Sequence, residues 1–433
     1  MTDPLKIAVA GLGTVGVGTL ELLAEQAALL AMRCGRPIQV TAVSARDRTR
    51  DRGVDLSGYQ WFEDAAAMAT EADAEVIVEL IGGSDGPALA LTEAALAAGR
   101  HVVTANKALI ALHGTALAAA AERSGATLAY EAAVAGAIPV IRAIREGLSA
   151  NTITRLHGIL NGTCNYILTT MRETGRDFDG VLADAQALGY AEADPSFDVD
   201  GIDTAHKLAI LASLAYGSPV NFDSIFVEGI RRISAEDIAF AEELGYRIKL
   251  LGTAEIGPDG LCQRVHPAMV PVDAPMASVE GVLNAVETET NFAGTTVLEG
   301  RGAGAGPTAS AVVGDIVDIA CGRTAYAFGR PTSELVAVDP APMESHIGPY
   351  YIRLMVYDKP GVFADVAAVL GQNEISMEAV IQRARSETEA VPVVVTTHET
   401  PESAMMRALD AIAGLSSVAE PPHVIRIEQF LGN

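Results

Sequence analysis

The first 130 residues alternate short β-rich runs with Ala- and Leu-rich stretches of helical period. The predicted strands are Lys6 to Ala10, Ile38 to Val43, Val76 to Leu80, His101 to Thr104 and Thr127 to Tyr130. Strands that alternate with helices indicate βαβ units, whose strands pair in parallel beneath helices on both faces. The pattern therefore predicts an α/β domain with a doubly wound parallel sheet over residues 1–130.

The pattern changes over residues 150 to 300. Strand-like runs at Ile153 to Leu160 and Val220 to Phe226 are mixed with helical stretches near 163–173, 179–188, 201–216 and 235–245. This mixture predicts a separate α+β domain, which we assign to substrate binding and dimerisation over residues 131–304. Four prolines between Pro331 and Pro349 then indicate a linker at 324–348.

The C-terminal part, residues 349–433, has a third pattern. Its predicted elements are a strand at Tyr350 to Val356, a helix at Gly361 to Gly371, strands at Ser376 to Ala384 and Val391 to Thr397, a helix at Glu402 to Ala413 and a strand at Val424 to Gln429. The order βαββαβ is that of a ferredoxin-like domain.

Composition agrees with a folded chain of several domains. The 433 residues are 49% apolar and 20% charged, and this length exceeds what one core usually serves. The formal net charge of −25 would repel phosphates and anionic lipids, so we expect neither nucleic acid nor membrane as a partner. The cysteines are scattered, and we find no signal peptide and no bilayer-spanning apolar run. We expect a cytoplasmic protein.

A glycine-rich turn follows the first strand. Gly11-Leu12-Gly13-Thr14-Val15-Gly16 opens a helical run from Val15 to about Met32, which is the context of a Rossmann dinucleotide fingerprint. Its glycines permit a tight turn and close backbone approach, so a pyrophosphate can sit on amide groups at the positive helix end. We assign these six residues to cofactor binding.

The end of the second strand bears on the choice of cofactor. An NAD site usually carries an acid there for the ribose 2′-hydroxyl, but Val43 is followed by Ser44. Arg46, Arg48 and Arg50 could instead bind a 2′-phosphate, which predicts a preference for NADP or use of both NADP and NAD. The alternative is that these arginines are solvated surface residues.

Asn106 and Lys107 follow the strand His101 to Thr104. The carboxyl ends of strands in an open α/β sheet form the ligand edge. We therefore predict that both residues contact the cofactor and that Lys107 also meets the substrate, although a solvated lysine is the plainer interpretation.

Five carboxylates precede an apolar helix between Gly189 and Lys207. Asp203 and Lys207 stand four residues apart, so on a helix they share one face and can pair or hold a common ligand. The alternative is a surface ion pair worth a few tenths of a kcal/mol. Reduction of an aldehyde needs a proton for the oxygen, which a lysine near carboxylates can donate. Glu192 and Asp203 offer acceptor oxygens for the ammonium group of an amino-acid substrate.

Cys164 supports a rival chemistry. A thiolate beside a nicotinamide could form a thiohemiacetal and run acylating oxidation of a semialdehyde, with His157 or His206 as the activating base. An inert buried thiol is the alternative. A catalytically silent amino-acid sensor is a third interpretation of the same domains.

Five motifs resemble the homoserine dehydrogenase family over nearly the whole chain. They are Gly-Leu-Gly-Thr-Val-Gly-Val-Gly from Gly11, Thr-Ala-Asn-Lys-Ala from Thr104, Tyr-Glu-Ala-Ala-Val-Ala-Gly-Ala-Ile-Pro from Tyr130, Asn-Gly-Thr-Cys-Asn-Tyr-Ile-Leu from Asn161 and Gly-Tyr-Ala-Glu-Ala-Asp-Pro from Gly189. The resemblance implies NAD(P)-dependent, reversible reduction of L-aspartate 4-semialdehyde to L-homoserine on the route to threonine, methionine and isoleucine.

The same resemblance implies roles for single residues. Lys207 would be the proton donor, Asp203 and Glu192 substrate ligands, and Lys107 would lie between cofactor and substrate. Gly189 and Gly304 would lie at the cofactor, with Gly304 preceding a helix at 305–323 that returns to the nucleotide domain. The resemblance also implies a monovalent cation, sodium, held by the Glu131 carboxylate and the carbonyls of Val134, Gly136 and Ile138, and oxygen-only ligation suits such a hard ion.

The tail resembles an ACT-type regulatory domain. It carries Asp-Lys-Pro-Gly-Val from Asp358 and Asn-Glu-Ile-Ser from Asn373. The resemblance implies threonine as a possible effector, with assistance to assembly as the alternative role. It also implies a homodimer or homotetramer.

Overall fold

The computed structural model describes residues 3–383, 386 and 389–430. The chain forms two compact units. The first contains Met1–Gly162, Asp203–Ile225 and Val282–Val338, and the second contains Thr163–Ile202, Phe226–Gly281 and Asp339–Asn433.

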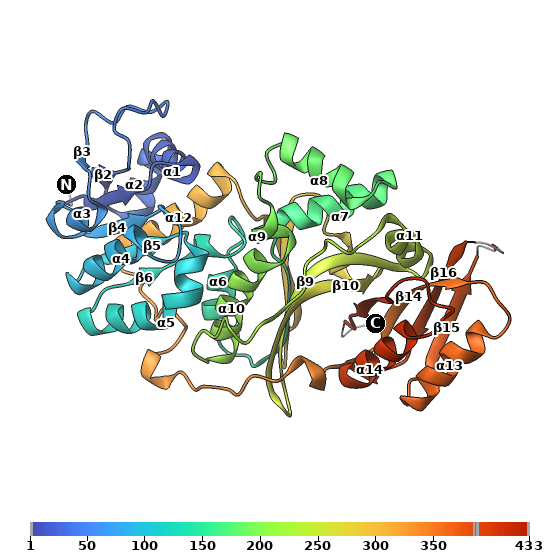
Figure 1. Cartoon of the computed structure of the whole chain (residues 1–433). Helices are drawn as coiled ribbons and strands as arrows, with labels where there is room; N and C mark the ends of the chain where they lie inside the picture. The colour runs from blue at the N-terminus through green and yellow to red at the C-terminus, as the bar shows by residue number, and fades with distance from the viewer. Residues whose placement is uncertain (1–2, 384–385, 387–388, 431–433) are drawn as a thin grey trace. The chain divides into compact units, whose positions relative to one another are not determined.

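The first unit contains a six-stranded parallel sheet (Figure 1). Its strands are β1 (Leu5–Ala10), β2 (Ile38–Ser44), β3 (Gln60–Phe62), β4 (Val76–Glu79), β5 (His101–Thr104) and β6 (Leu128–Ala129). Their spatial order is β3-β2-β1-β4-β5-β6, the doubly wound arrangement in which ligands bind outside the carboxyl ends of the strands. The predicted Rossmann-type fold is confirmed, with β3 as a strand that the pattern did not reveal.

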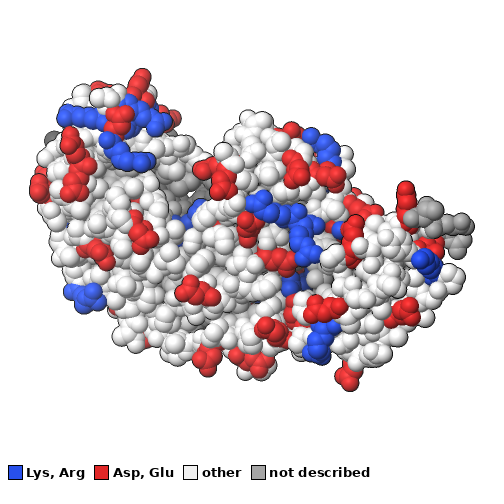
Figure 2. Space-filling model, viewed as in Figure 1, with Lys and Arg blue, Asp and Glu red and all other residues white. Residues whose placement is uncertain are grey.

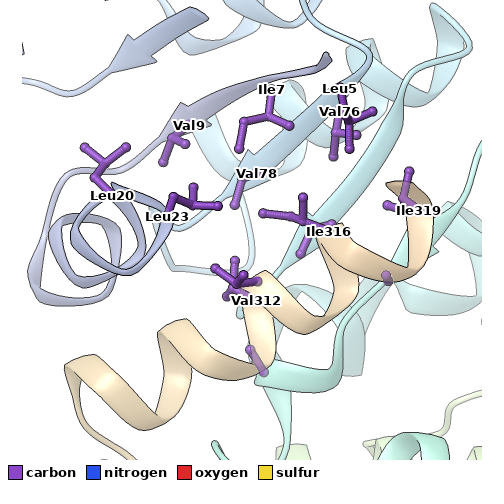
Figure 3. Close-up of a cluster of buried hydrophobic side chains, with 14 of the residues drawn as sticks. Leu5, Ile7, Val9, Leu20, Leu23, Val76, Val78, Val312, Ile316 and Ile319 are labelled. Carbon is purple, nitrogen blue, oxygen red and sulfur yellow. The ribbon is translucent and has the colours of Figure 1, made fainter. Parts of the chain in front are cut away.

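Helices cover this sheet. They are α1 (Thr14–Glu25), α2 (Ala27–Cys34), α3 (Ala65–Glu71), α4 (Pro87–Ala97), α5 (Lys107–Ser124) and α12 (Ala305–Ala320). Figure 3 shows Leu20 and Leu23 of α1 and Val312 and Ile316 of α12 directed toward apolar residues of β1 and β4. The single helix predicted from Val15 to Met32 is wrong, because the chain bends by 75° between α1 and α2.

The remainder of the first unit comprises a second, antiparallel sheet and further helices. The elements are α6 (Val140–Arg142) with a π-helical turn (Ala143–Gly147), β7 (Ile153–Ile159), α10 (Ile202–Tyr216), β11 (Leu283–Thr290) and β12 (Gly294–Arg301), with 3-10 turns at Glu131–Ala133 and Thr332–Glu334. Strand β11 pairs with both β7 and β12.

The predicted strand from Val220 to Phe226 is wrong over most of its length. The amide of Ile225 donates to the carbonyl of Phe222 at 3.1 Å, and the hydroxyl of Ser224 donates to the carbonyl of Asn221 at 3.1 Å. These contacts form a turn, which Asn, Asp and Ser favour by bonding to nearby backbone. Extended structure begins only at β8 (Phe226–Val227).

The second unit begins with helices and a long hairpin. Its elements are α7 (Gly162–Thr174), α8 (Phe178–Ala187), α9 (Ser196–Val199), β8, α11 (Ala235–Glu243), β9 (Tyr246–Gly257) and β10 (Gly260–Pro271), with a 3-10 turn at Pro275–Ser278. Strands β9 and β10 pair antiparallel along their whole length.

The C-terminal elements complete the second unit. They are β13 (Ile347–Gly348), β14 (Tyr350–Tyr357), α13 (Val362–Gln372), β15 (Met377–Gln382), β16 (Ala390–Thr397), β17 (Thr400–Pro401), α14 (Glu402–Ala413) and β18 (His423–Ile427), preceded by a 3-10 turn at Met343–Ser345. The spatial order β18-β14-β16-β15 confirms the ferredoxin-like plan. Ala384, the predicted end of the second strand, lies outside the described residues. Strand β18 also pairs in parallel with β10, so this small sheet continues into the long hairpin.

Charge and apolar length complete the description. Figure 2 shows acidic side chains spread over the visible face and a group of basic side chains over the loop between β2 and β3. Within the described residues, no single helix combines the length and apolar character needed to cross a membrane, and only the bent pair of α1 and α2 reaches them jointly.

Candidate functional site

The turn between β1 and α1 has the geometry of a phosphate cradle. Gly11 has φ of 95°, and a Cβ there would lie 2.3 Å from the carbonyl carbon of Leu80. A Cβ on Gly16 would lie 2.0 Å from the Gly11 carbonyl oxygen. At Gly13 nothing lies within 4 Å of the Cβ position, so the backbone before α1 faces open space. The first amide groups of a helix have no partner within it and can bind an anion.

A groove of about 380 Å³ lies in front of this turn. Its lining residues are Leu12, Gly13, Thr14, Val17, Gly18, Glu21, Arg50, Asp51, Arg52 and Ala305. Gly304, the N-cap of α12, immediately precedes Ala305 and has φ of 117°. Val15 lies in the first turn of α1, where its carbonyl accepts from Thr19. The groove is therefore lined by the middle of the predicted fingerprint, the start of α12 and part of the arginine-rich loop.

Arg52, a residue that the sequence pattern did not single out, fixes that loop against the fingerprint. Its Nε donates to the carbonyl of Leu12 at 3.2 Å, and its Nη2 donates to the carbonyl of Asp47 at 2.6 Å. The guanidinium groups of Arg48 and Arg52 lie 5.9 and 5.8 Å from the ring of Trp61. Arg46, which we predicted at the cofactor, is exposed and does not line the groove.

Glu79, at the carboxyl end of β4, organises the neighbouring strand ends. Its fully buried carboxylate accepts the amides of Ile81 at 2.7 Å and Gly82 at 3.1 Å, and the hydroxyl of Thr104 at 2.6 Å. Asn106 caps α5 by accepting the amide of Leu109 at 3.1 Å. These bonds fix the backbone that carries Lys107, and the position of Glu79 at a strand end was the signal that could have identified it.

Asp203 joins two lysines. Its Oδ1 lies 2.5 Å from Nζ of Lys107, and its Oδ2 accepts from Nζ of Lys207 at 2.7 Å. Lys207 also donates to the carbonyl of Leu160 at 2.5 Å, and Asn161 Nδ2 donates to Asp203 Oδ2 at 2.8 Å. The predicted pair on α10 is therefore present. The structure adds Lys107 and Asn161 to it.

Burial and charge set the ionisation of this cluster. Burial opposes ionisation of Asp203, yet the charges of Lys207 and Lys107 and the bonds they donate hold its pKa well below the usual range. Burial lowers the pKa of His206, whose ring stacks on Phe222 with 4.5 Å between centroids. The cluster is thus one carboxylate between two amines, of which Lys107 keeps 34% of its side chain exposed and Lys207 only 10%.

The remaining predicted residues near the substrate lie in the second unit. Glu192 is exposed in the loop between α8 and α9, where its carbonyl accepts from Gln186 at 3.0 Å. Gly189 ends the turn after α8 with φ of 76°. Cys164 is fully buried in α7, and its thiol donates to the carbonyl of Asp198 at 3.3 Å. This contact is that of a packed thiol.

Glu131 and Asp315 are two buried acidic residues that lie next to each other. The carboxylate of Glu131 accepts the amides of Ile141 at 2.8 Å and Arg142 at 3.1 Å, and the amide of Glu131 donates to Asp315 at 2.9 Å. Burial and the charge of Asp315 raise the pKa of Glu131 to about 7, against the backbone bonds and the charge of Arg142. Four residues on, Ala135 has φ of 55°. A non-glycine residue in this region marks a constrained turn.

That turn carries the other predicted cation ligands. Val134, Gly136 and Ile138 are in or beside it, and the Ile138 carbonyl accepts from the amide of Val140 at 2.7 Å. Gly136 has φ of 52°, and a Cβ there would lie 2.5 Å from the carbonyl oxygen of Gly302. The buried oxygen donors at Glu131 are therefore two carboxylates, its own and that of Asp315, and this donor type fits a hard cation.

A different set of potential ligands lies in the second sheet of the first unit. His157 of β7 and Glu287 and Glu289 of β11 are buried, and their ligand atoms lie within 4.8 Å of one another. One imidazole and two carboxylates suit transition metals better than alkali ions. This group therefore differs in selectivity from the oxygen-only set at Glu131.

Family models match three parts of the chain. The model described as the homoserine dehydrogenase NAD-binding domain matches residues 11–131, the homoserine dehydrogenase model matches residues 139–317, and an ACT domain model matches residues 350–414.

Known proteins agree with these matches. A homoserine dehydrogenase of Pseudomonas aeruginosa is 46% identical over 99% of each chain. The crystal structure of a homoserine dehydrogenase from Thiobacillus denitrificans superposes with a TM-score of 0.92 at 43% identity, covering 98% of each chain. A hyperthermophilic archaeal homoserine dehydrogenase in complex with NADPH has a TM-score of 0.63 at 28% identity, covering 73% of this chain and 97% of its own.

Proposed function

The chain belongs to the homoserine dehydrogenase family, and from that membership we propose that it interconverts L-aspartate 4-semialdehyde and L-homoserine with Lys207 as the acid and base of the reaction. The observation that carries this assignment is the Asp203 carboxylate, bonded to Lys107 at 2.5 Å and to Lys207 at 2.7 Å. Asp203 and Lys207 are nearly excluded from solvent, so a proton held there exchanges with a bound substrate before it exchanges with water.

The proton step follows from the state of Lys207. Because Asp203 favours the charged amine, Lys207 is an ammonium when the aldehyde binds. A bound nicotinamide supplies the hydride that reaches the carbonyl carbon. Lys207 then gives its proton to the developing alkoxide, and Asp203 and the Leu160 carbonyl keep the amine oriented. In the direction of homoserine oxidation, the neutral amine of Lys207 takes the proton of the hydroxyl.

The charged groups of the substrate indicate which side chains would bind it. An amino-acid substrate carries an ammonium and a carboxylate, which need an acceptor and a cation. We assign the ammonium group to Glu192 and Asp203, and Lys107 to the junction between cofactor and substrate. Lys107 suits this role because it begins α5 at the ligand edge of the parallel sheet and keeps a third of its side chain exposed.

For the cofactor we propose NADP in preference to NAD. The pyrophosphate would lie at the turn from Gly11 to Gly16, whose residues Leu12, Gly13 and Thr14 line the groove together with Arg50 and Arg52. Arg52 is fixed by its bond to Leu12, so its charge stays beside the fingerprint. A guanidinium binds a phosphate in a bidentate manner. Arg46 would add positive charge near the groove without lining it.

We further propose a monovalent cation, sodium, on Glu131, Val134, Gly136 and Ile138. Burial, and then the charge of Asp315, raise the pKa of Glu131, and Arg142 offsets this only in part. A bound cation would supply charge compensation and fix the constrained turn. Its role would be structural, since none of the proposed proton steps uses it.

For the C-terminal domain we propose threonine as effector, and for the chain a homodimer or homotetramer. Both rest on the family and on the ACT domain match. The pathway served would be the synthesis of threonine, methionine and isoleucine. Millimolar threonine should change activity or melting temperature, and light scattering should give a mass of two or four chains. No response to threonine would remove the effector proposal and leave the catalytic one intact.

A spectrophotometric assay tests the activity itself. Homoserine should drive reduction of NADP, and to a lesser extent of NAD, while serine, shorter by one carbon, should drive neither. If homoserine reduced neither cofactor but aspartate semialdehyde with phosphate did, the acylating chemistry of Cys164 would replace this proposal. If no substrate turned over while threonine still bound, the chain would be the amino-acid sensor.

A further inference from the structure

Two cysteines meet at the ends of two helices in the nucleotide-binding part of the first unit. Cys34 is the last residue of α2, and Cys321 is the first residue after α12. Sγ of Cys321 lies 3.7 Å from the carbonyl oxygen of Arg33. The Cys321 side chain therefore lies beside the C-terminal end of α2, the helix that α12 contacts. Burial first, and then this neighbouring thiol, raise the pKa of Cys34.

The surroundings allow both access and movement. Both thiols are only half-buried, unlike the fully buried thiol of Cys164. Each cysteine is followed by a glycine in the left-handed region, Gly35 with φ of 68° and Gly322 with φ of 69°. A disulfide demands a narrow range of Cα separation and torsion. Helix ends that terminate in glycine can adjust to it without disturbing the helices.

We propose that Cys34 and Cys321 form a redox-sensitive dithiol that a hydroperoxide converts into a disulfide between α2 and α12. One of the two thiols attacks the peroxide as its thiolate, so an S–O bond forms, the O–O bond breaks, and water or an alcohol leaves after taking up a proton. The other thiol then attacks the sulfenic sulfur. An S–S bond forms, the S–O bond breaks and water leaves, so that two electrons pass from the two sulfurs to the peroxide.

The position of the pair gives the disulfide a structural consequence. Helix α12 begins at Ala305, which lines the cofactor groove, and packs along α1, which begins at the fingerprint. A disulfide would link the C-terminal end of α12 to the C-terminal end of α2, the helix that follows α1. It would close a long loop, which removes conformations from the unfolded chain. The oxidised protein should therefore melt at a higher temperature than the reduced one.

Thiol counting on the full chain tests the proposal. The chain has four cysteines. Treatment of the folded protein with hydrogen peroxide should leave two titratable thiols after denaturation, and peptide mapping should give one linked pair, Cys34 with Cys321. Dithiothreitol should restore four thiols.

Variants separate this pair from the other cysteines. Cys34→Ser and Cys321→Ser should each prevent the disulfide and the rise in melting temperature. Cys262→Ser is the matched control, because Cys262 is half-buried but lies in the second unit, and it should still lose two thiols and keep the rise. The proposal is overturned if the wild-type peptides stay unlinked, link between chains, or carry only sulfinic acid.

Discussion

Replacing Lys207 with methionine removes the amine and keeps an unbranched side chain of similar length. Asp203 would lose one of its two cations but keep Lys107 at 2.5 Å and Asn161 at 2.8 Å. The stability cost should therefore be that of one charge-assisted bond, about 1.5 to 3 kcal/mol. The larger cost of a buried orphan charge, about 3 to 5 kcal/mol, does not apply.

The effect on turnover should be larger. A positioned acid or base contributes roughly 10² to 10⁴ in rate, which corresponds to about 2.7 to 5.4 kcal/mol at 1.36 kcal/mol for each tenfold change. In steady-state homoserine oxidation, kcat should fall by that factor. KM for NADP should change little, because Lys207 bonds to Asp203 and Leu160 and does not line the cofactor groove.

Lys249→Met is the matched control. Lys249 is also a buried lysine that donates to a backbone carbonyl, that of Val279, and to one side-chain oxygen, that of Asn165. Burial lowers its pKa to about 8. Its replacement should move the melting temperature but leave kcat within about threefold of the wild type, since it belongs to no proposed proton step. If both variants lowered kcat equally, or if Lys207→Met kept more than a tenth of the wild-type turnover, the assignment of Lys207 would fail.

Four further outcomes follow from the structure. Arg52→Ala should raise KM for NADP about 10- to 100-fold, which corresponds to the loss of a charged hydrogen bond of about 1.5 to 3 kcal/mol. KM for NAD should rise much less, and equal changes in both KM values would refute a 2′-phosphate contact. Cys164→Ala should keep full homoserine oxidation, because the thiol is buried and bonded to Asp198, and loss of activity without loss of fold would revive the acylating chemistry. Exchange of sodium for tetramethylammonium at constant ionic strength should lower the melting temperature of the wild type but not of Glu131→Gln, and an unchanged wild type would count against the cation. His423 and Arg353 hold the pKa of Asp237 below its usual range, against the effect of burial. Ionised Asp237 should therefore stabilise the fold above the unfolded pKa of about 3.9, and this contribution should be lost as pH falls through the native pKa. Asp237→Asn should flatten the dependence of melting temperature on pH between 5 and 3, and an unaltered slope would contradict the shift.

The parts of the fold that the sequence predicted are those with a local signal. The first strand is followed by a glycine-rich turn that opens a helix, so the fingerprint identified the start of the parallel sheet. The C-terminal domain has short strands separated by clear helical stretches, and its order was predicted in full. In both cases each element carries its own pattern, and no distant contact is needed to identify it.

The long hairpin of β9 and β10 was missed for a physical reason. Seven consecutive residues of β9, from Ile248 to Ala254, are buried, so the strand has no alternation between apolar and polar sides. A fully buried strand of this kind has the same pattern as a buried helix. Strand β11 was hidden differently, because its buried Glu287 and Glu289 look like exposed positions in a sequence. The bend after Glu25 has neither glycine nor proline to indicate it.

In the candidate site, too, one contact could be predicted from the sequence and others could not. The spacing of Asp203 and Lys207 on one helix predicted their contact, because four residues return to the same face. The contact of Asp203 with Lys107 joins α10 to the start of α5, and nothing in either segment indicates the other. Likewise, Arg52 reaches the fingerprint only because the loop after β2 folds back on Trp61 and Leu12. The chemistry of this site therefore lies in one carboxylate whose partners come from separate parts of the chain. It follows that a substitution at Asp203 should affect both lysines at once, and its effect on kcat should not equal the sum of the effects of Lys107→Met and Lys207→Met.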